Sequence, residues 1–223
     1  MHIELRNIHF SFGGSKLLND VNMFVEDGEC IAISGGSGSG KSLLFSILCG
    51  TLKTDKGQVL ANGQDLRDMS SDQNQAFRKT LGAVFQRSAL LSNLSLEENL
   101  MLPLNLHFPA LTQTQKLERV KNIADEFGFS RYLHWRIDRI SVGMTCLAGL
   151  ARALVIEPKC LIWDAPLIDV DQIWNNLVKT KLRQAKDAGA TIIIFSNRKD
   201  IIDELADRQF VLSEARLRLK HAA

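Results

Sequence analysis

The sequence predicts an α/β fold in which a parallel sheet carries a helical insertion and a small antiparallel sheet lies near the N-terminus. Short, almost continuously apolar runs predict the parallel strands, because such runs are typical of strands covered on both faces. These runs are Cys30–Ser34, Leu81–Phe85, Cys160–Trp163, Thr191–Phe195 and Gln209–Leu212. Between Gln86 and Ile156 the pattern predicts helices and loops and no strand.

The N-terminal segments have a different pattern. His2–Phe12, Val21–Val25 and Gln58–Ala61 alternate in polarity or are punctuated by Gly-Gly, Asp-Gly and Asn-Gly. These dipeptides favour the tight turns of hairpins. We therefore expect an antiparallel sheet in this part of the chain.

One helix of the insertion can be placed from its spacing. In TQKLERVKNIADEFGF, one apolar face would contain Leu117, Val120, Ile123, Ala124 and Phe127. The glycine after Phe127 is well placed to end the helix.

Composition limits the possible functions. The 223 residues suffice for one domain with a subdomain, since single cores stop growing near ~250 residues. The 27 basic and 25 acidic side chains give a net charge of +2, which does not indicate a nucleic-acid partner. The four cysteines form no CxxC pair, which favours reduced, buried thiols in a cytosolic protein. No run approaches the ~18 to 20 apolar residues of a membrane span, so we expect a partner to provide any span.

A glycine-rich stretch between a predicted strand and a predicted helix gives the sharpest signal. It fits the pattern G-x-x-x-x-G-K-[ST] and consists of Gly35, Gly36, Ser37, Gly38, Ser39, Gly40, Lys41 and Ser42. Glycines let backbone N–H groups surround phosphates, and the positive end of the following helix attracts them. Lys41 would contact the β- and γ-phosphates, and Ser42 would bind Mg²⁺. A flexible Gly/Ser turn is the simpler alternative, which the strand-to-helix position disfavours.

Asp164 ends the apolar run CLIWD. An acid in this position is weak evidence alone, because strand ends commonly carry solvated aspartates. Beside a phosphate-binding loop it is the expected direct or water-mediated Mg²⁺ partner of a P-loop NTPase.

Further motifs, in their order along the chain, resemble the nucleotide-binding subunits of ATP-binding cassette (ABC) transporters. LGAVFQ places Gln86 like the Q-loop glutamine of that family, which approaches Mg²⁺, the attacking water and the membrane partner. ISVGMTCLAGLARALVIEPKCLIWDAP resembles its signature and Walker B block. Phe12 matches an aromatic residue that stacks on adenine, and Asp171 matches the D-loop aspartate.

The resemblance covers residues 2 to 215 and implies a RecA-like P-loop core. It divides a single domain, 1–223, into an ATP-binding core of 1–86 and 157–223 and a helical subdomain of 87–156. It also implies ATP and Mg²⁺ as ligands, a second ABC ATPase subunit as homo- or heterodimer partner, and a membrane permease. The expected location is the cytoplasmic face of the cell membrane.

Within the family, FQRSALLSNLSLEENLMLPL and the Met144 that ends the signature look most like the ATPases of Mla-type lipid transport. Lipoprotein-releasing and cell-division ATPases share the style of FRKTLGAVFQ. The long C-terminal extension of some Mla-type ATPases does not follow.

Three positions depart from the family pattern near the γ-phosphate. In the signature, which would face the partner's ATP, Ser141, Gly143 and Met144 accompany Val142 instead of the first glycine. Valine avoids positive φ and limits how closely the backbone approaches a phosphate, unless it simply packs in a compatible backbone conformation.

The catalytic glutamate after Asp164 is replaced by Ala165, and the H-loop histidine by Asn197. Alanine cannot activate water, and general-base help is worth ~10²- to 10⁴-fold in rate. The amide of Asn197 can donate a hydrogen bond towards the γ-phosphate but cannot become cationic. The departures predict a subunit that binds Mg-ATP and hydrolyses it slowly or not at all.

Other hypotheses remain open. Gln86, Asp171 or another acid could replace the missing glutamate in a working transport ATPase. A non-transporting regulatory ATPase of the cell-division type is a third possibility. A soluble P-loop kinase is the least supported, because no arginine-rich lid follows.

Overall fold

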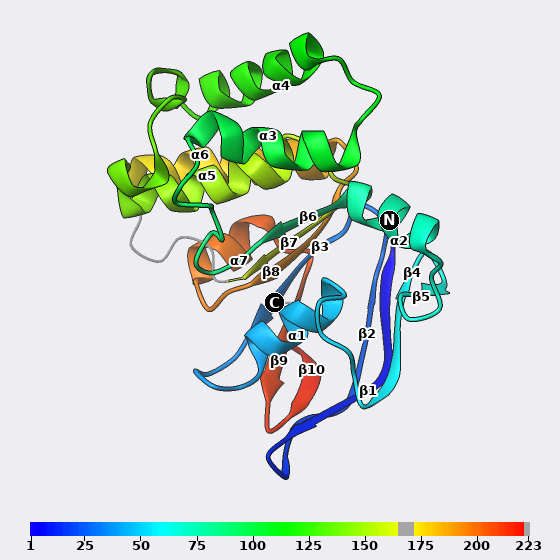
Figure 1. Ribbon diagram of the computed structural model, residues 1–223. Coiled ribbons are helices and arrows are strands. Elements are labelled where there is room, and N and C mark those ends of the chain that lie inside the picture. The colour runs from blue at the N-terminus through cyan, green and yellow to red at the C-terminus, as the bar shows by residue number, and fades with distance from the viewer. Residues whose placement is uncertain (165–171, 221–223) are drawn as a thin grey trace.

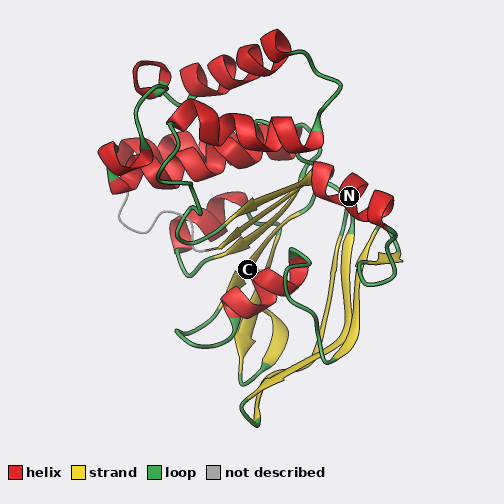
Figure 2. Cartoon of the chain, viewed as in Figure 1, coloured by secondary structure: helices red, strands yellow, loops and turns green. Residues whose placement is uncertain are grey.

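The computed structural model describes residues 1–164 and 172–220, and it contains two sheets and a helical layer (Figures 1 and 2). The larger sheet has the order β10-β9-β3-β8-β7-β6. All its neighbouring strands are parallel except the antiparallel pair β9 and β10. Its strands are β3 (Cys30–Ser34), β6 (Leu81–Val84), β7 (Cys160–Asp164), β8 (Thr191–Phe195), β9 (Arg208–Ser213) and β10 (Arg216–Lys220).

The smaller sheet is antiparallel, as predicted, with the order β2-β1-β4-β5. Its strands are β1 (Ile3–Phe12), β2 (Ser15–Val25), β4 (Lys56–Ala61) and β5 (Gln64–Asp65). Helix α1 (Lys41–Leu48) packs between the two sheets, and its Phe45 lies in the core that they share.

The central strands are buried on both faces, which confirms the prediction from their continuous apolarity. In β7, Cys160 and Ile162 face the core around α1, whereas Leu161 and Trp163 face the core under the helical layer. This alternation with period two gives one strand two hydrophobic faces. The strand therefore fixes the position of Asp164 at its end.

The chain leaves the sheet after β6 and returns to it at β7, which pairs with β6 (Figure 1). The helices between these strands are α3 (Leu96–His107), α4 (Gln113–Glu126) and α5 (Val142–Leu154), with 3-10 turns at Ser130–Tyr132 and Ile137–Arg139. The described residues 87–156 contain no named strand, as predicted, and only one isolated bridge.

The apolar face predicted for α4 packs as expected. Val120, Ala124 and Phe127 are buried, and Gly128 follows the helix with a φ of +70°. The remaining helices are α2 (Ser71–Thr80), α6 (Gln172–Asp187) and α7 (Lys199–Leu205). Across residues 1–164 and 172–220, no helix combines the length and apolar character that crossing a membrane requires.

Candidate functional site

The glycine-rich loop joins β3 to α1, as the sequence predicts. Gly38 and Gly40 have φ angles of +74° and +99°, which L side chains rarely adopt. Gly40 is the N-cap of α1 and provides no side-chain hydrogen bond to the first turn. The N–H groups of that turn and the positive end of the helix dipole are suited to an anion.

A pocket of about 500 Å³ lies beside this loop. It brings together residues from the loop and from the ends of three parallel strands, as expected at the carboxyl edge of such a sheet. The lining residues are Ser37, Gly38, Ser39, Gly40, Lys41, Ser42, Leu43, Gln86, Asp164, Phe195, Ser196, Asn197 and Arg198. The predicted Mg²⁺ ligands therefore share one pocket with the predicted phosphate ligands.

Lys41 folds back over its own loop. Its Nζ donates hydrogen bonds to the carbonyl oxygens of Gly35 and Gly36, at 2.6 and 2.8 Å. Partial burial lowers the pKa of the Lys41 ammonium, and the negative charge of Asp164 opposes this shift. The Lys41 ammonium group is therefore held at the loop, where the negative charge of Asp164 attracts it.

The residues present fit a nucleotide phosphate with Mg²⁺. The buried Asp164, the Ser42 hydroxyl and the Gln86 amide supply oxygen atoms, which Mg²⁺ prefers, and one carboxylate is common where phosphates complete the coordination. A Cβ added at Gly36 or Gly38 would meet nothing within 4 Å, so there is open space beside the loop. The Ser39 hydroxyl is buried without a hydrogen-bond partner in the described part of the chain. A buried hydroxyl of this kind is suited to a hydrogen bond with a ligand or with water.

Asn197 contacts the same loop. Its Oδ1 accepts a hydrogen bond from the Gly35 N–H at 2.9 Å, and its Nδ2 donates one to the Gly35 carbonyl at 2.9 Å. The side chain therefore contacts the loop backbone, a contact that the sequence did not indicate. A hydrogen bond from Asn197 to a γ-phosphate stays a prediction.

The loop after Gln86 has an unusual backbone. Ser88 and Ala89 have φ angles of +37° and +47°. Arg152 donates to the carbonyls of both residues, at 2.8 Å each, and burial lowers its pKa. The guanidinium fork holds this strained turn, which directly follows Gln86.

The signature residues lie at the start of α5. Ser141 is the N-cap, and its hydroxyl accepts a hydrogen bond from the Met144 N–H at 3.3 Å. Val142 is the first residue of the helix and its φ is not positive, and the residue is 76% exposed in this chain. Ser141, Val142, Gly143 and Met144 are not among the described residues that line the pocket.

One other predicted site residue lies apart from the pocket, and two cannot be placed. Phe12 ends β1 and is 76% exposed, and it is not among the described residues that line the pocket. Ala165 and Asp171 lie outside the described residues. Arg198 does line the pocket, and its only signal in the sequence is its place beside Asn197.

Comparisons with known proteins agree on one family. The ABC transporter family model matches residues 18–168. The energy-coupling factor transporter ATP-binding protein EcfA of Methanothermobacter thermautotrophicus is 32% identical over 219 residues, covering 96% of this chain and 69% of that protein. The methionine import ATP-binding protein MetN of Clostridium acetobutylicum is 29% identical over 207 residues, covering 92% of this chain. The chain spans 57 to 64% of the length of the first methionine-import relatives.

Solved structures support the same fold. The structure of cbiO1 from Clostridium perfringens, part of the transporter complex cbiONQ, has a TM-score of 0.81 at 29% identity and covers 97% of this chain and 86% of that one. A dimeric ATP-binding cassette bound to ADP and Pi has a TM-score of 0.90 at 23% identity, with coverage of 98% and 97%, and supports the fold alone. Together, the family model, the relatives and the fold show that the chain belongs to the ABC transporter family and is an ATP-binding domain of that family.

Proposed function

We propose that the chain is the nucleotide-binding subunit of an ABC transporter that binds Mg-ATP and hydrolyses it slowly or not at all. One observation carries the proposal: Lys41, Ser42 and Asp164 line one pocket, whereas the residue after Asp164 is an alanine. Binding groups are therefore present where the residue that would activate water is missing.

Each group of the pocket has a proposed role. Lys41 and the N–H groups of residues 36–42 would hold the β- and γ-phosphates. Ser42, Gln86 and Asp164 would hold Mg²⁺ directly or through water. The bound nucleotide would supply the phosphates that a second subunit recognises. Phe12 would stack on adenine, and its exposed ring is available for that contact.

A second ABC ATPase subunit, identical or related, is part of the proposal. The first residues of α5 are not among the described residues that line this chain's pocket, and Val142 is exposed. Such a helix end can serve a phosphate held by a partner subunit. The valine side chain would keep the two subunits further apart than glycine would. Asp171 would lie in the same interface.

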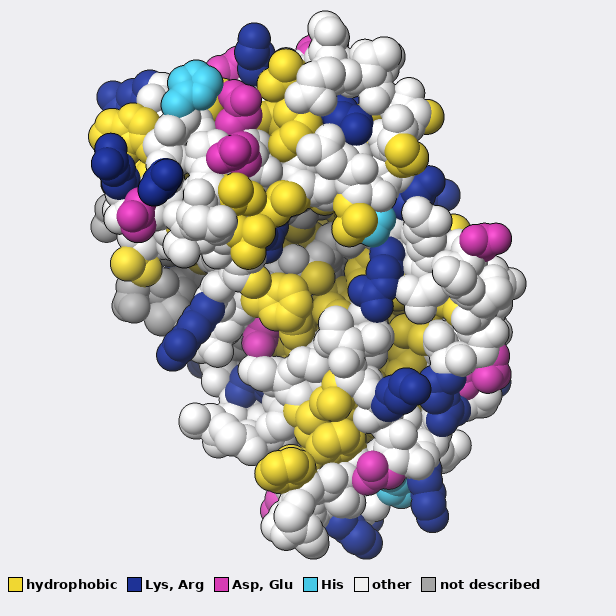
Figure 3. Space-filling model, viewed as in Figure 1, with side chains coloured by type: hydrophobic (Ala, Val, Ile, Leu, Met, Phe, Trp, Pro, Cys, Tyr) yellow, Lys and Arg dark blue, Asp and Glu magenta, His cyan; other side chains and the backbone are white. Residues whose placement is uncertain are grey.

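A membrane permease is the second proposed partner. Figure 3 shows hydrophobic side chains gathered in a hollow of the face beside the helical layer. An apolar pocket of about 590 Å³ on this part of the chain is lined by Leu102, Pro103, Asn105, Leu106, His107 and Arg152. We propose that residues 87–156 form the subdomain that meets the permease, and that residues 1–86 and 157–223 form the ATP-binding core. The chain would then be peripheral on the cytoplasmic face of the membrane.

Two cargo classes remain candidates. The resemblance of FQRSALLSNLSLEENLMLPL to Mla-type ATPases favours lipid. The names of the methionine-import relatives favour an amino acid such as methionine. An assay that measures transport of lipid and of amino acid separately, in vesicles containing the permease, would distinguish these candidates.

The competing functions differ in turnover. A working ATPase would need Gln86, Asp171 or another acid to replace the missing glutamate. A regulatory ATPase of the cell-division type would bind nucleotide without moving cargo. The first alternative predicts rapid phosphate release, and the second predicts nucleotide-dependent binding of a membrane partner without transport.

The experiment compares wild type with Ala165→Glu, Ala165→Glu/Asn197→His and Lys41→Ala. Binding of a fluorescent ATP analogue with Mg²⁺ and phosphate release at saturating Mg-ATP are measured on each protein. We expect wild type to bind the analogue, Lys41→Ala to lose that binding, and the double variant to release phosphate ~10²-fold faster than wild type or more. Wild-type turnover that Ala165→Glu does not increase and Lys41→Ala abolishes would refute the proposal of slow hydrolysis. Failure of wild type to bind the analogue would refute nucleotide binding itself.

A further inference from the structure

The pairing of Asn197 with Gly35 resembles that of two peptide groups. The side-chain amide of Asn197 carries an acceptor oxygen and a donor nitrogen on the same carbon. The backbone of Gly35 offers the complementary N–H donor and carbonyl acceptor, and each hydrogen bond is 2.9 Å long. We propose that Asn197 is a positioning residue of the phosphate-binding loop: it sets the affinity for diphosphate and triphosphate nucleotides alike and does not sense the γ-phosphate. This inference rests on the proposed nucleotide binding.

Only an amide side chain suits this contact. Aspartate has acceptors and no donor when it is ionised. A neutral histidine has one donor and one acceptor, but its two ring nitrogens point in strongly divergent directions and cannot both meet the backbone of one residue. The departure from the family histidine therefore adds a contact to this loop as well as removing a titratable group.

Gly35 also lies close to β9 and to Ser39. A Cβ at this position would lie 2.4 Å from the carbonyl oxygen of Leu212 in β9 and 2.7 Å from Ser39 Oγ. The start of the loop thus sits between β9 and the amide of Asn197. Loss of the two hydrogen bonds would free the loop on the side of Asn197 alone.

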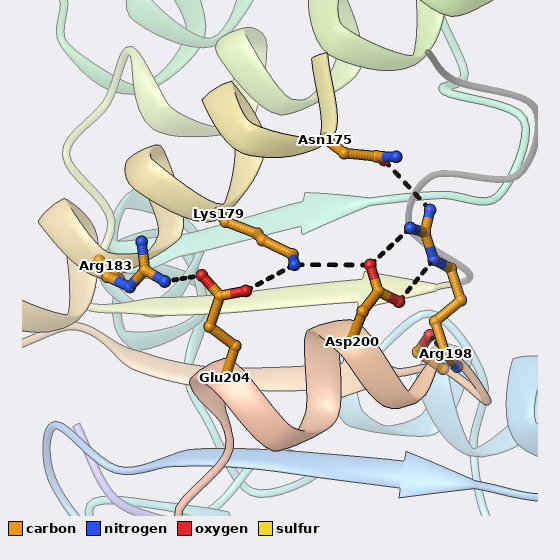
Figure 4. Close-up of polar contacts among 7 residues, drawn as sticks. Asn175, Lys179, Arg183, Arg198, Asp200 and Glu204 are labelled. Carbon is orange, nitrogen blue, oxygen red and sulfur yellow. Dashed lines mark hydrogen bonds and ion pairs between the residues drawn. The ribbon is translucent and has the colours of Figure 1, made fainter. Parts of the chain in front are cut away.

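The residue next to Asn197 is braced by two helices (Figure 4). The Arg198 guanidinium donates to the Asp200 carboxylate at 3.0 and 2.7 Å and to Asn175 Oδ1 in α6 at 3.1 Å. Lys179 of α6 in turn forms ion pairs with Asp200 at 3.5 Å and Glu204 at 2.5 Å. These contacts fix the backbone on which Asn197 stands, so its amide is presented to Gly35 in a defined direction.

The same contacts join α6 to the start of α7. Asn175 is buried, and the side chain of Lys179 is only 10% exposed, so this part of the network is shielded from water. The Ser196 hydroxyl adds a hydrogen bond from the Arg198 N–H at 3.1 Å. Asn197 therefore lies beside a network of polar contacts that connects α6 to α7.

The position of Asn197 leads to a distinctive binding pattern. A side chain that senses the γ-phosphate contributes to the binding of ATP and not of ADP. A side chain that positions the loop contributes to both, because the loop holds the β-phosphate of either nucleotide. Two hydrogen bonds predict a loss of roughly tenfold in affinity for each nucleotide.

The test measures dissociation constants of fluorescent ADP and ATP analogues, with Mg²⁺, for wild type, Asn197→Ala and Asn197→His. Asn122→Ala, an exposed asparagine of α4, is the matched control. Measurements are made well below the melting temperature of every variant, so that a merely structural role would leave the dissociation constants of the folded protein unchanged. If Asn197→Ala does not fold, Asn197→His, which retains side-chain bulk, supplies the comparison.

We expect Asn197→Ala to weaken ADP and ATP binding by the same factor and Asn197→His to weaken ADP binding, while the control binds as wild type does. A loss confined to ATP would overturn the inference in favour of a γ-phosphate sensor. Unchanged affinity for both nucleotides would also overturn it. Absence of binding by wild type would be a separate result, since it refutes the proposed function.

Discussion

Gly35→Ala tests whether the phosphate-binding loop is held as tightly as its geometry indicates. The added Cβ would lie 2.4 Å from the Leu212 carbonyl oxygen, whereas ordinary contacts begin near 3.4 Å. The two backbones must separate by about 1 Å. Leu212 cannot move alone, because β9 pairs with both β3 and β10.

The expected loss of stability follows from this overlap. Overpacking of this kind destabilises by ~1–3 kcal/mol. The reduced freedom of the unfolded chain returns ~0.4–1 kcal/mol of that loss. In a domain of this size, a net loss of ~1–2 kcal/mol lowers the melting temperature by ~2–8 °C. A displacement of ~1 Å in a binding loop can also weaken its function by up to ~10²-fold.

The assay is thermal unfolding of the nucleotide-free chain, followed by binding of a fluorescent ATP analogue. Gly36→Ala is the matched control, because its Cβ would meet nothing within 4 Å and its φ is not in the positive region. We expect the control to keep the wild-type melting temperature or exceed it slightly. Equal melting temperatures for the two variants would show that the loop yields easily and would refute the reasoning.

Three further predictions concern the surroundings of the pocket. Asn99→Leu removes three hydrogen bonds that a fully buried amide makes to the loop 91–95, at 2.8, 3.0 and 2.9 Å, and should lower the free energy of unfolding by ~2–5 kcal/mol, measured in urea. Burial raises the pKa of the Cys30 and Cys160 thiols to about 12, so iodoacetamide at pH ~8 should leave both unmodified in the folded chain, and mass spectrometry checks this. The carboxyl pKa of Asp65 is lowered because hydrogen bonds and the charge of Arg67 outweigh burial. Its stabilisation is therefore present above the unfolded value near 3.8 and is lost as the pH falls through the folded pKa. Asp65→Asn should accordingly lose less stability than wild type between pH ~5 and ~2, and an equal loss would contradict the assignment.

Much of the fold could be predicted because its signals are local and repeated. Continuous apolarity in segments such as Cys160–Trp163 requires cover on both faces, and the structure has it. Elements with few buried apolar residues could not be predicted in this way. Helix α2 buries only Phe77 and has no apolar face to detect, although its capping box, Ser70 with Gln73, was present in the sequence. Strand β10, RLRLK, is similarly mostly exposed.

The candidate site was predictable in part for a topological reason. Parallel strands end at the same edge, so Gln86 and Asp164 reach the phosphate-binding loop from sites far apart in the chain. The contact of Asn197 with Gly35 could not be predicted, because a side-chain amide can pair with many backbone groups and sequence alone does not rank them. The direction of its two hydrogen bonds depends on packing around Arg198.

The Gly35 carbonyl oxygen has two donors at once, Lys41 at 2.6 Å and Asn197 at 2.9 Å. A carbonyl can accept two hydrogen bonds, and one is enough to avoid the penalty of an unsatisfied acceptor. If the lysine turns towards a phosphate, the oxygen keeps its bond to asparagine. When Lys41 exchanges partners in this way, the Gly35 carbonyl is not left without a hydrogen bond. This lowers the free-energy cost of turning the lysine charge towards a ligand.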